Sequence, residues 1–475
     1  MKKLSLLLCC VLLAFACKKE QQKKEISQIE NTQNTSLVSN EMLETAVIYE
    51  ANIRQYSPEG TFDAFTKDIP QLKELGVKII WLMPVFPISE TKRKATGEKF
   101  ASDFSEEERK KYLGSYYAVS DFKKINPEFG TIEDFRALVK TAHDNGISVI
   151  LDWVPNHTGW DHTWITTHPE FYTKNADGEI TDPLNEDGTP VGWADVADLN
   201  YDNKELRKEM VSDMLHWIEN ENIDGFRCDV AGSVPTDFWV EAVPQLRAKK
   251  DIFMLAEAWE PELLKDDLFD MAYGWDRHHA MNHIAKGEHK VAHWDETYSK
   301  DTARYENDDI LMTFVTNHDE NSWNGTIQER MGNGASAFTA LSYTVPGMPL
   351  IYSGQEYGLN HRLKFFEKDS IPKTKGKEWA LLKKLGDLKQ NNLALHGGKN
   401  AASYERLDTA NENVLAFKRS KQGKELIYIA NLSETEQIFT SIISGSYLNY
   451  LSGDKETIEN KEFKLKPWEF RIFVN

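Results

Sequence analysis

Cysteine is scarce in this sequence, and its scarcity excludes a disulfide framework. The 475 residues include four cysteines, of which Cys9, Cys10 and Cys17 lie near the N-terminus. Cys228 is the one cysteine in the rest of the chain, so we expect no intramolecular disulfide there. Because Cys228 lies inside an apolar run, it is predicted to be an inert thiol in the protein core.

Positive charge is also in short supply. Lys and Arg together number 56, against 75 Asp and Glu, which gives a net charge of −19 and an isoelectric point near 5.2. A surface of this charge repels nucleic acid and anionic membrane lipids. No nucleic-acid partner is therefore expected, and a neutral ligand suits this surface better.

Long hydrophobic runs are absent except for a short one at the N-terminus. Residues 4–16 are mostly apolar and follow a basic start, which is typical of a secretory signal peptide over residues 1–16. A transmembrane helix needs about 20 apolar residues, so this run is too short to be one. Cys17 follows the small residue Ala16, a pattern that resembles the lipobox of bacterial lipoproteins. We expect a lipoprotein that is held at a membrane, the outer membrane, through lipid on Cys17 alone; the alternative is a plain signal peptide cleaved near Ala16.

Composition divides the rest of the chain into segments. Residues 17–44 are rich in Lys, Glu and Gln and almost without bulky apolar side chains, which predicts a lipid-bearing, disordered tether. Residues 45–394 alternate short β-rich runs with helical patterns, which predicts an α/β fold with a parallel sheet, a (β/α)8 TIM barrel. The eight strands are expected at 46–53, 77–83, 147–152, 223–229, 252–257, 271–274, 310–316 and 349–353. Residues 395–475 change to alternating strands, which predicts a C-terminal antiparallel β-sandwich.

Residues 156–200 are predicted to be a loop domain inserted after the third strand. This segment is rich in Trp, Asp, Gly and Pro and has no clear period. Long irregular loops in compact proteins are usually functional, so we expect the segment to line a cleft. Trp160, Trp164 and Trp193 are candidate platforms for sugar rings, although packing of the small domain is the favoured interpretation.

Four short stretches place a carboxylate where a buried strand gives way to a loop. They are residues 151–158, 224–231, 254–259 and 314–320. In a (β/α)8 barrel the C-terminal ends of all strands open onto one face, so these carboxylates can converge on one pocket. Carboxylates with two His and one Arg are the groups needed to cleave a glycosidic bond.

Asp229 and Glu257 are the candidate catalytic pair. Arg227 precedes Asp229 by two residues, so both side chains face the same side of one strand. A guanidinium there keeps Asp229 ionised, as a nucleophile requires. Glu257 lies among apolar residues, which suits a carboxyl that stays protonated until it donates its proton. Two further pairs offer carboxylates and donors for sugar hydroxyls: Asp319 with His318, and Asp152 with His157.

In order and spacing, the four stretches resemble the four signature regions of the α-amylase family, the family 13 glycoside hydrolases. Segments 114–122 and 196–200 resemble two further regions of that family, and the likeness runs from about residue 46 to the end. The resemblance implies a retaining α-glucan hydrolase that cleaves α-1,4 bonds of malto-oligosaccharides or starch fragments. The roles it implies are nucleophile for Asp229, general acid/base for Glu257, transition-state stabiliser for Asp319, orientation of Asp229 for Arg227, and substrate binding for Tyr117, Asp152, His157 and His318.

The sequence also departs from the family. Gly232 and Ser233 stand where many members have a Lys-His pair that serves the acceptor side, which weakens any claim to classical action on long starch. Asn156 and Asp198 match calcium-ligand positions of the family, so the resemblance implies Ca²⁺ there, and no organic cofactor. Two alternatives remain open: a transglycosylase on the same scaffold, and a non-catalytic glucan-binding lipoprotein, against which the complete set of catalytic carboxylates argues.

Overall fold

The computed structural model describes residues 36–185, 187–459 and 462–475. The predicted signal peptide over 1–16, the predicted lipidation site Cys17 and most of the predicted tether therefore lie outside the described residues. Within the described ranges, no helix combines the length and the apolarity that crossing a membrane requires. Residues 38–475 group into one unit.

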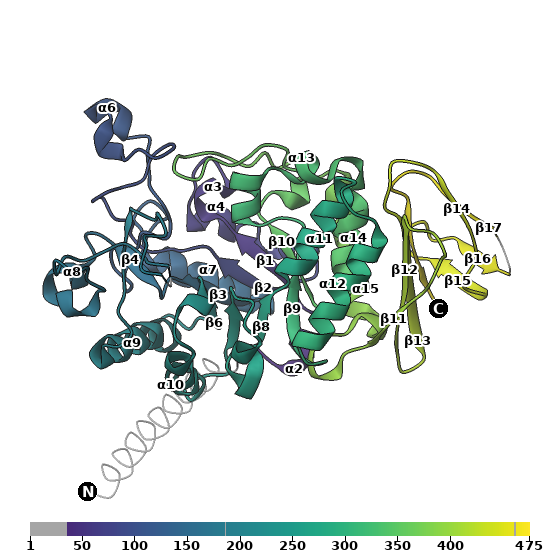
Figure 1. Cartoon of the computed structure of the whole chain (residues 1–475), viewed down its shortest axis with the longest axis horizontal. Helices are drawn as coiled ribbons and strands as arrows, with labels where there is room; N and C mark the ends of the chain where they lie inside the picture. The colour runs from purple at the N-terminus through teal and green to yellow at the C-terminus, as the bar shows by residue number, and fades with distance from the viewer. Residues whose placement is uncertain (1–35, 186, 460–461) are drawn as a thin grey trace, which may run out of the picture. The chain divides into compact units, whose positions relative to one another are not determined.

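Eight parallel strands close into the barrel that the sequence predicts (Figure 1). Their order around the barrel is β1-β10-β9-β8-β7-β6-β3-β2. The strands are β1 (Val47–Ala51), β2 (Val77–Leu82), β3 (Ser148–Trp153), β6 (Gly225–Cys228), β7 (Phe253–Ala256), β8 (Met271–Tyr273), β9 (Ile310–Thr313) and β10 (Met348–Tyr352). The fold prediction is confirmed, and Cys228 is a free, buried thiol.

Burial of both faces explains why these strands read as continuous apolar runs. Every residue of β1, β3 and β10 is buried. Alternate side chains such as Ile48, Trp81 and Met312 form one apolar cluster, and the intervening ones pack in a larger cluster with the helices. A parallel sheet that is covered on both faces needs this pattern. Acidic side chains near the C-terminal ends of these strands, such as Glu50 on β1 and Asp152 on β3, are exceptions to this apolar pattern.

Helices alternate with the strands, as a (β/α)8 barrel requires. The helices are α3 (Ile53–Tyr56), α4 (Phe62–Thr66), α5 (Ile69–Lys73), α6 (Glu106–Arg109), α7 (Ile132–Asp144), α9 (Lys204–Asn220), α10 (Thr236–Arg247), α11 (Trp275–Ala285), α12 (Val291–Arg304), α13 (Ile327–Met331), α14 (Ala335–Thr344) and α15 (Lys377–Asn391). A capping box at Thr131 and Asp134 begins α7, where each side chain bonds the other residue's backbone N–H. Its buried face then packs on the barrel.

The inserted segment leaves the barrel after β3. Its elements are the antiparallel strands β4 (His157–Gly159) and β5 (Val196–Asp198) and the short helix α8 (Thr163–Thr167). Trp164 is buried against Phe122, and the Trp160 ring nitrogen donates to the carbonyl of Ala194 at 3.0 Å. These two indoles therefore pack the segment together. Trp193, by contrast, is 40% exposed, which leaves its ring free for a ligand.

Antiparallel strands form the C-terminal part of the chain, as expected. A six-stranded sheet has the order β11 (Ser403–Arg406), β12 (Val414–Lys421), β13 (Lys424–Asn431), β18 (Phe470–Val474), β15 (Gly445–Asn449) and β16 (Lys455–Ile458), and a second sheet pairs β14 (Gln437–Thr440) with β17 (Glu462–Leu465). Apolar residues of both sheets, among them Ala416, Ile429 and Phe463, share one cluster. The Tyr428 hydroxyl donates to the carbonyl of Ala337, which joins β13 to the barrel helix α14 (Figure 1).

The predicted tether over 17–44 is wrong at its C-terminal end. Residues Asn40–Thr45 form helix α2, which begins with Ser39 as a hydrogen-bonding N-cap. Glu44 is buried and accepts a hydrogen bond of 2.6 Å from the side chain of Asn400. A helix of six residues is not stable by itself in water, so the polar local sequence gives no sign that a helix forms here. Contacts with a distant part of the chain stabilise it instead.

Candidate active site

Arg227 holds three carboxylates together at the C-terminal ends of neighbouring strands. Its guanidinium lies 2.7 Å from Asp152 Oδ1, 2.9 Å from Asp229 Oδ1 and 2.7 Å from Glu257 Oε2. Arg227 is in β6 and Asp152 in β3, while Asp229 and Glu257 directly follow β6 and β7. Arg227 and Asp152 are fully buried, whereas the other two side chains keep 11% and 13% of their surface exposed. The cluster therefore presents Asp229 and Glu257 to a ligand and hides the groups that hold them.

The backbone at the end of β6 keeps this pair in place. Val230 has a left-handed conformation, with φ of 37°, and its N–H donates to Glu257 Oε2 at 2.9 Å. The backbone N–H of Asp229 donates to the carbonyl of Trp153, and that of Glu257 to the carbonyl of Cys228. A β-branched residue with positive φ is strained, so the surrounding bonds must enforce it. The strained conformation of Val230 therefore holds its backbone N–H in the position that binds the Glu257 carboxylate.

A second set of contacts is centred on His318. Its Nδ1 lies 2.5 Å from Glu50 Oε1, and its Nε2 lies 2.8 Å from the Tyr117 hydroxyl and 3.4 Å from Asp319 Oδ2. The Tyr117 hydroxyl also donates to Asp152 Oδ2 at 3.0 Å. The structure thus brings the residues from four separate stretches of sequence into one connected network.

Burial raises the pKa of all three carboxyl groups around Arg227. The pKa of Asp229 and of Asp152 rises to about 6, and that of Glu257 to about 7, because burial outweighs the opposing charge of Arg227. Glu257 is the weaker acid, so the pair carries its proton on Glu257 near neutral pH. A neutral acid beside an ionised carboxylate is the state that a retaining glycosidase needs.

The two histidines of the site titrate in opposite directions. Burial alone would lower the pKa of His318, but the carboxylates of Asp319 and Glu50 outweigh it and raise this pKa to about 9. Burial lowers the pKa of His157 to about 3. At neutral pH, His318 is therefore a cation with two N–H donors, whereas His157 is neutral.

An open cavity of about 390 Å³ lies over this network. The predicted site residues that line it are Asp229, Glu257, Asp319, Tyr117, His157 and His318. Trp193 of the inserted segment borders it too, so that segment lines the cleft as expected. Asp152 and Arg227 lie beneath the cavity and reach it only through their neighbours. This volume is within the usual range for small-molecule sites, roughly 300–1,000 Å³.

Three residues of the network escape prediction from the sequence. Glu50 is a fully buried carboxylate in the middle of apolar β1, and that incongruity is the signal that could have revealed it. The ring nitrogen of Trp81 donates to Asp152 Oδ2 at 3.1 Å, and the Tyr273 hydroxyl accepts from Arg227 Nε at 3.3 Å. Both aromatic residues look like ordinary barrel core in sequence, so nothing local separates them from their neighbours.

Asn156 and Asp198, the predicted calcium ligands, lie at one end of the antiparallel β4–β5 pair. His157 is the register partner of Asp198, and Asn156 Nδ2 lies 3.3 Å from His157 Nδ1. In the parts of the chain that the structure describes, no group of three or more His, Cys, Asp or Glu is arranged to hold a metal ion. Two side chains fall short of the roughly six to eight oxygens that Ca²⁺ takes.

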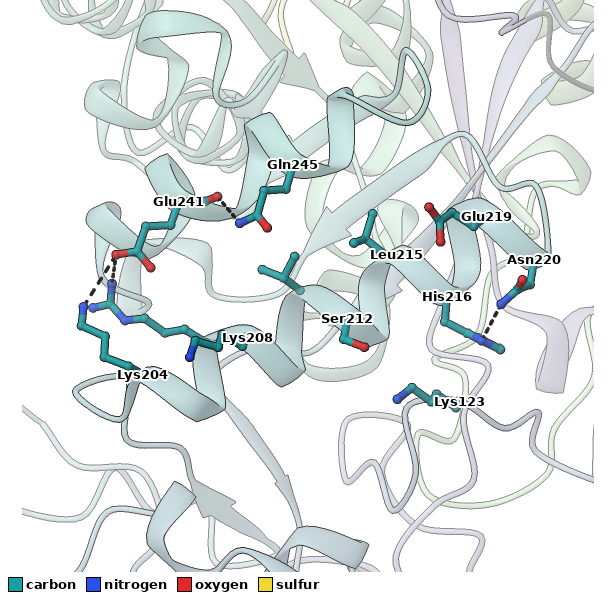
Figure 2. Close-up of a pocket in the computed structure, with 12 residues that line it drawn as sticks. Lys123, Lys204, Lys208, Ser212, Leu215, His216, Glu219, Asn220, Glu241 and Gln245 are labelled. Carbon is teal, nitrogen blue, oxygen red and sulfur yellow. Dashed lines mark hydrogen bonds and ion pairs between the residues drawn. The ribbon is translucent and has the colours of Figure 1, made fainter.

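A larger hollow, of about 640 Å³, lies between α9 and α10 (Figure 2). Its charges are compensated locally: Arg207 lies 3.0 Å from Asp237 and 3.1 Å from Glu241. Lys208 and Glu205, one turn apart on α9, are paired at 2.7 Å. These cations are thus already paired, and an ion pair such as Lys208–Glu205, which is exposed on both sides, contributes little to stability. The chemistry therefore lies at the mouth of the barrel and not in the larger hollow.

Comparison with known proteins agrees with the geometry. Residues 27–187 and 189–386 match the model of the alpha-amylase catalytic domain. An alpha-amylase of Haloarcula japonica is 27% identical over 344 residues, which cover 70% of this chain and 47% of the relative. A 4-alpha-glucanotransferase of Thermotoga neapolitana is 28% identical over 338 residues, which cover 63% of this chain and 68% of the relative. This chain thus aligns with about half the length of the Haloarcula protein.

Solved structures show the same architecture. A crystal structure of an alpha-amylase from Lactobacillus plantarum has a TM-score of 0.79 and 30% sequence identity, and the match covers 92% of this chain and 100% of that one. A noncanonic maltogenic alpha-amylase from Thermotoga neapolitana also has a TM-score of 0.79, at 26% identity. The similarity therefore includes the C-terminal sheets as well as the barrel.

Proposed function

Because this chain belongs to the α-amylase family, we propose that it is a retaining glycosidase that cleaves α-1,4 bonds of malto-oligosaccharides or starch fragments. The observation that carries this proposal is the Arg227 cluster, in which one buried guanidinium orients both Asp229 and Glu257 beneath one open cavity. A cluster that served only to bind glucan would not need two adjacent carboxyl groups whose pKa values are raised to different extents, to about 6 for Asp229 and about 7 for Glu257. This argues against the glucan-binding alternative.

In the first step, Asp229 attacks the anomeric carbon. A bond forms between that carbon and a carboxylate oxygen while the glycosidic C–O bond breaks, and Glu257 gives its proton to the departing oxygen. Asp319 and the carboxylate of Asp229 stabilise the positive charge that develops on the sugar ring. His318 and His157 border the cavity as a charged donor and a neutral imidazole, suited to sugar hydroxyls.

In the second step, the glycosyl–enzyme bond is broken. Glu257, now ionised, takes a proton from water while the water oxygen attacks the anomeric carbon and Asp229 leaves. Two displacements restore the α configuration. A sugar hydroxyl in place of water gives transglycosylation, which is the second candidate because one of the relatives is named a 4-alpha-glucanotransferase.

The acceptor side favours small, soluble substrates. A Cβ atom at Gly232 would lie 2.4 Å from Glu260 Oε2, so this carboxylate occupies the space beside the glycine. An acidic group therefore stands near the place where many family members carry a Lys-His pair. We expect malto-oligosaccharides to be better substrates than granular starch for this reason.

Proton NMR during hydrolysis of maltoheptaose tests the mechanism. The first product should be the α-anomer, before mutarotation mixes the anomers, because two displacements retain configuration. kcat/KM should follow a bell-shaped pH profile with an acid limb near pH 6 and an alkaline limb near pH 7. The acid limb reports ionisation of Asp229, which must be charged to attack, and the alkaline limb reports Glu257, which must be protonated to donate.

Asp229→Asn is the matched variant for this experiment. It should lower kcat/KM by several orders of magnitude, because an amide cannot replace the carboxylate as nucleophile, while the melting temperature stays close to that of the wild type. A β-anomer as first product would overturn the nucleophilic role of Asp229. Products longer than the substrate would indicate transfer, and absence of any product would favour the binding alternative.

We also propose that the protein is a lipoprotein of the outer membrane. The proposal rests on the basic and apolar start of the sequence and on Cys17 after a small residue. Several acyl chains hold a protein firmly at a membrane, whereas the acidic surface by itself would not. Fractionation of cells that express Cys17→Ala tests this: the variant should leave the membrane fraction, and its retention there would refute lipidation at Cys17.

From the family resemblance we also propose that Ca²⁺ binds near Asn156 and Asp198. Backbone carbonyls and water would have to complete the ligand set, since two side chains do not. Thermal melts with Ca²⁺ and with a chelator test it, because a ligand that binds the native state raises its melting temperature. Equal melting temperatures under the two conditions would contradict the proposal.

A further inference from the structure

Three aromatic side chains form a wall at one end of the catalytic cavity. Trp323, Phe365 and Phe366 line the same cavity as the catalytic carboxylates. Their ring centroids lie 5.1, 5.2 and 5.7 Å apart, so the three rings are in mutual contact. The indole of Trp323 is 50% exposed, which is unusual for so large an apolar side chain. We call these three residues the aromatic wall.

Barrel topology places the aromatic wall across the mouth from the nucleophile. Trp323 lies on a single helical turn, η5 (Glu320–Asn324), that follows β9, and the two phenylalanines lie in the loop after β10. In the closed order of strands, β10 is four strands away from β6 in either direction. Asp229 follows β6 and Glu257 follows the adjacent β7. β10 is also three strands away from β7, so the two phenylalanines and the acid/base stand on different sides of the cavity.

The position of the acid tells which end of the substrate meets the wall. Glu257 protonates the leaving oxygen, so the departing, acceptor part of the chain extends on the Glu257 side. The donor part, which carries the non-reducing end, extends the other way. The two phenylalanines lie on that side, away from Glu257, and the ring of Phe365 is nearly parallel to that of Tyr117, at 13°, with the centroids 6.5 Å apart. The wall thus begins close to the ring that is cleaved.

Hydrogen bonds fix the loop that carries the two phenylalanines. Gln55, on α3 directly after β1, donates from Nε2 to the carbonyls of Lys364 and Glu367, both at 2.7 Å. The backbone N–H of Leu113 donates to the carbonyl of Phe366 at 2.6 Å. Buried side-chain donors on backbone carbonyls are costly to break. The segment therefore behaves as a fixed wall and not as a lid.

Asn321 joins the two halves of the aromatic wall. Its Oδ1 accepts from the backbone N–H of Leu363 at 2.8 Å, and its Nδ2 donates to the carbonyl of His361 at 3.3 Å. Asn321 is buried and lies two residues before Trp323 on the same turn. These hydrogen bonds consequently fix the turn that carries Trp323 relative to the loop that carries Phe365 and Phe366.

We propose that the aromatic wall ends the donor side of the cleft, so that the enzyme binds the non-reducing end of a malto-oligosaccharide and releases short products of fixed length. This inference rests on the proposed function and deepens it from glycosidase to exo-acting glycosidase. An aromatic face binds the apolar face of a glucose ring, and a rigid one also stops the chain from passing. The non-reducing terminal ring is the occupant that such a stop selects.

A pair of substrates tests the inference directly. One is 4-nitrophenyl α-maltoheptaoside, and the other is the same compound with a 4,6-O-ethylidene block on its non-reducing glucose. The wild type should cleave the free substrate at least about tenfold faster than the blocked one, since aromatic contacts of this kind are worth a factor of about 2 to 10 each. Chromatography at the first few per cent of turnover should show one short product from the non-reducing end.

Variants of the aromatic wall sharpen the result. Trp323→Ala should bring the two rates together and lengthen the products, because it opens the end of the cleft, whereas Trp323→Phe should keep the wild-type pattern. Phe366→Leu gives a second, milder opening if the first variant folds poorly. Ile438→Ala, which removes a 51% exposed apolar side chain from the C-terminal sheets, is the matched control and should change nothing.

The two hypotheses fail in different ways. Absence of cleavage of either substrate by the wild type would refute the proposed function itself. Cleavage of both substrates at equal rates, with products of many lengths, would leave the glycosidase intact and overturn the exo assignment. An unchanged product pattern in both Trp323→Ala and Phe366→Leu would likewise show that the aromatic wall does not set the length of the products.

Discussion

Two buried arginines of this protein have opposite surroundings. Arg227, at the active site, lies among three carboxylates, and these charges outweigh the effect of burial and raise its pKa well above the ordinary value. Arg419, on β12 where the C-terminal sheets meet the barrel, is equally buried, and burial lowers its pKa to about 10. Among the described residues, its hydrogen-bond partners are the backbone carbonyls of Ser403, Thr344, His396 and Ala402.

The difference separates a chemical use of buried charge from a structural one. Carboxylates around Arg227 can change their protonation during a reaction, and the guanidinium sets the energy of each state. Carbonyls around Arg419 cannot titrate, so that guanidinium serves as a multiple donor that ties loops together. Mutations at the two positions should therefore affect different properties.

The largest effect is expected for Arg227→Met. Loss of the guanidinium should lower kcat/KM by a factor on the order of 10³, near the upper end of what one preorganised electrostatic group supplies. The carboxyl groups of Asp152, Asp229 and Glu257 already have raised pKa values, and these would rise further without Arg227. Such groups bind more protons when folded than when unfolded, so stability falls as pH rises through their folded pKa values.

Melting curves of Arg227→Met at pH 5 and pH 8 check that sign. The variant should lose little stability at pH 5, where the carboxyl groups are protonated, and more at pH 8. A variant that keeps wild-type activity would show that Arg227 is not part of the catalytic cluster. Equal stability losses at the two pH values would contradict the role of the carboxylates.

The next effect is expected for Arg419→Met, and it concerns stability. Four carbonyls would lose their donor, at about 1–3 kcal/mol for each group that stays unsatisfied, partly offset because no charge is then buried. We expect a net loss of roughly 2–5 kcal/mol in the free energy of unfolding, with kcat/KM of the folded enzyme unchanged. Denaturant titration and steady-state kinetics below the transition measure the two quantities. A variant as stable as the wild type would mean that burial of the charge costs as much as its four hydrogen bonds contribute.

The smallest effect is expected for Lys389→Met, near Arg419. Lys389 is buried and donates to the carbonyl of Leu395 at 2.7 Å, and burial lowers its pKa to about 7. The unfolded chain binds this proton up to a pKa of about 10.4, so wild-type stability should rise with pH between about 7 and 10. The difference in melting temperature, variant minus wild type, should therefore be most favourable at pH 6 and decrease toward pH 10. A difference that is constant with pH would show that Lys389 keeps an ordinary pKa.

Much of the barrel follows from the sequence because its strands are buried on both faces. All eight strands appear as apolar runs, and chain direction alone places Asp229, Glu257 and Asp319 at one end. The C-terminal sheets are harder to predict strand by strand: β11, β15 and β16 are partly exposed and mix polar with apolar residues. Helix α2 escapes prediction because distant contacts stabilise it.

The parts of the site that the sequence does not reveal depend on contacts between distant segments. Glu50 lies 268 positions from His318, yet their side chains are 2.5 Å apart. Trp323 and Phe365 lie in two different loops, and neither the length nor the composition of these loops predicts that the two rings are in contact. Residue types identify the reacting groups, whereas closure of the barrel decides which other side chains surround them.

Helix α2 determines where a mechanical load would enter the enzyme. The helix directly precedes β1, so it lies at the N-terminal end of that strand, opposite the face on which the cavity opens. Glu44 fastens it to Asn400 and to His396, whose Nδ1 is 2.9 Å away. If lipid on Cys17 anchors the protein, a pulling force on the N-terminal segment would reach α2 first. Glu44 would transmit this force to His396 and Asn400, at the junction of the barrel and the C-terminal sheets, and not to the catalytic loops.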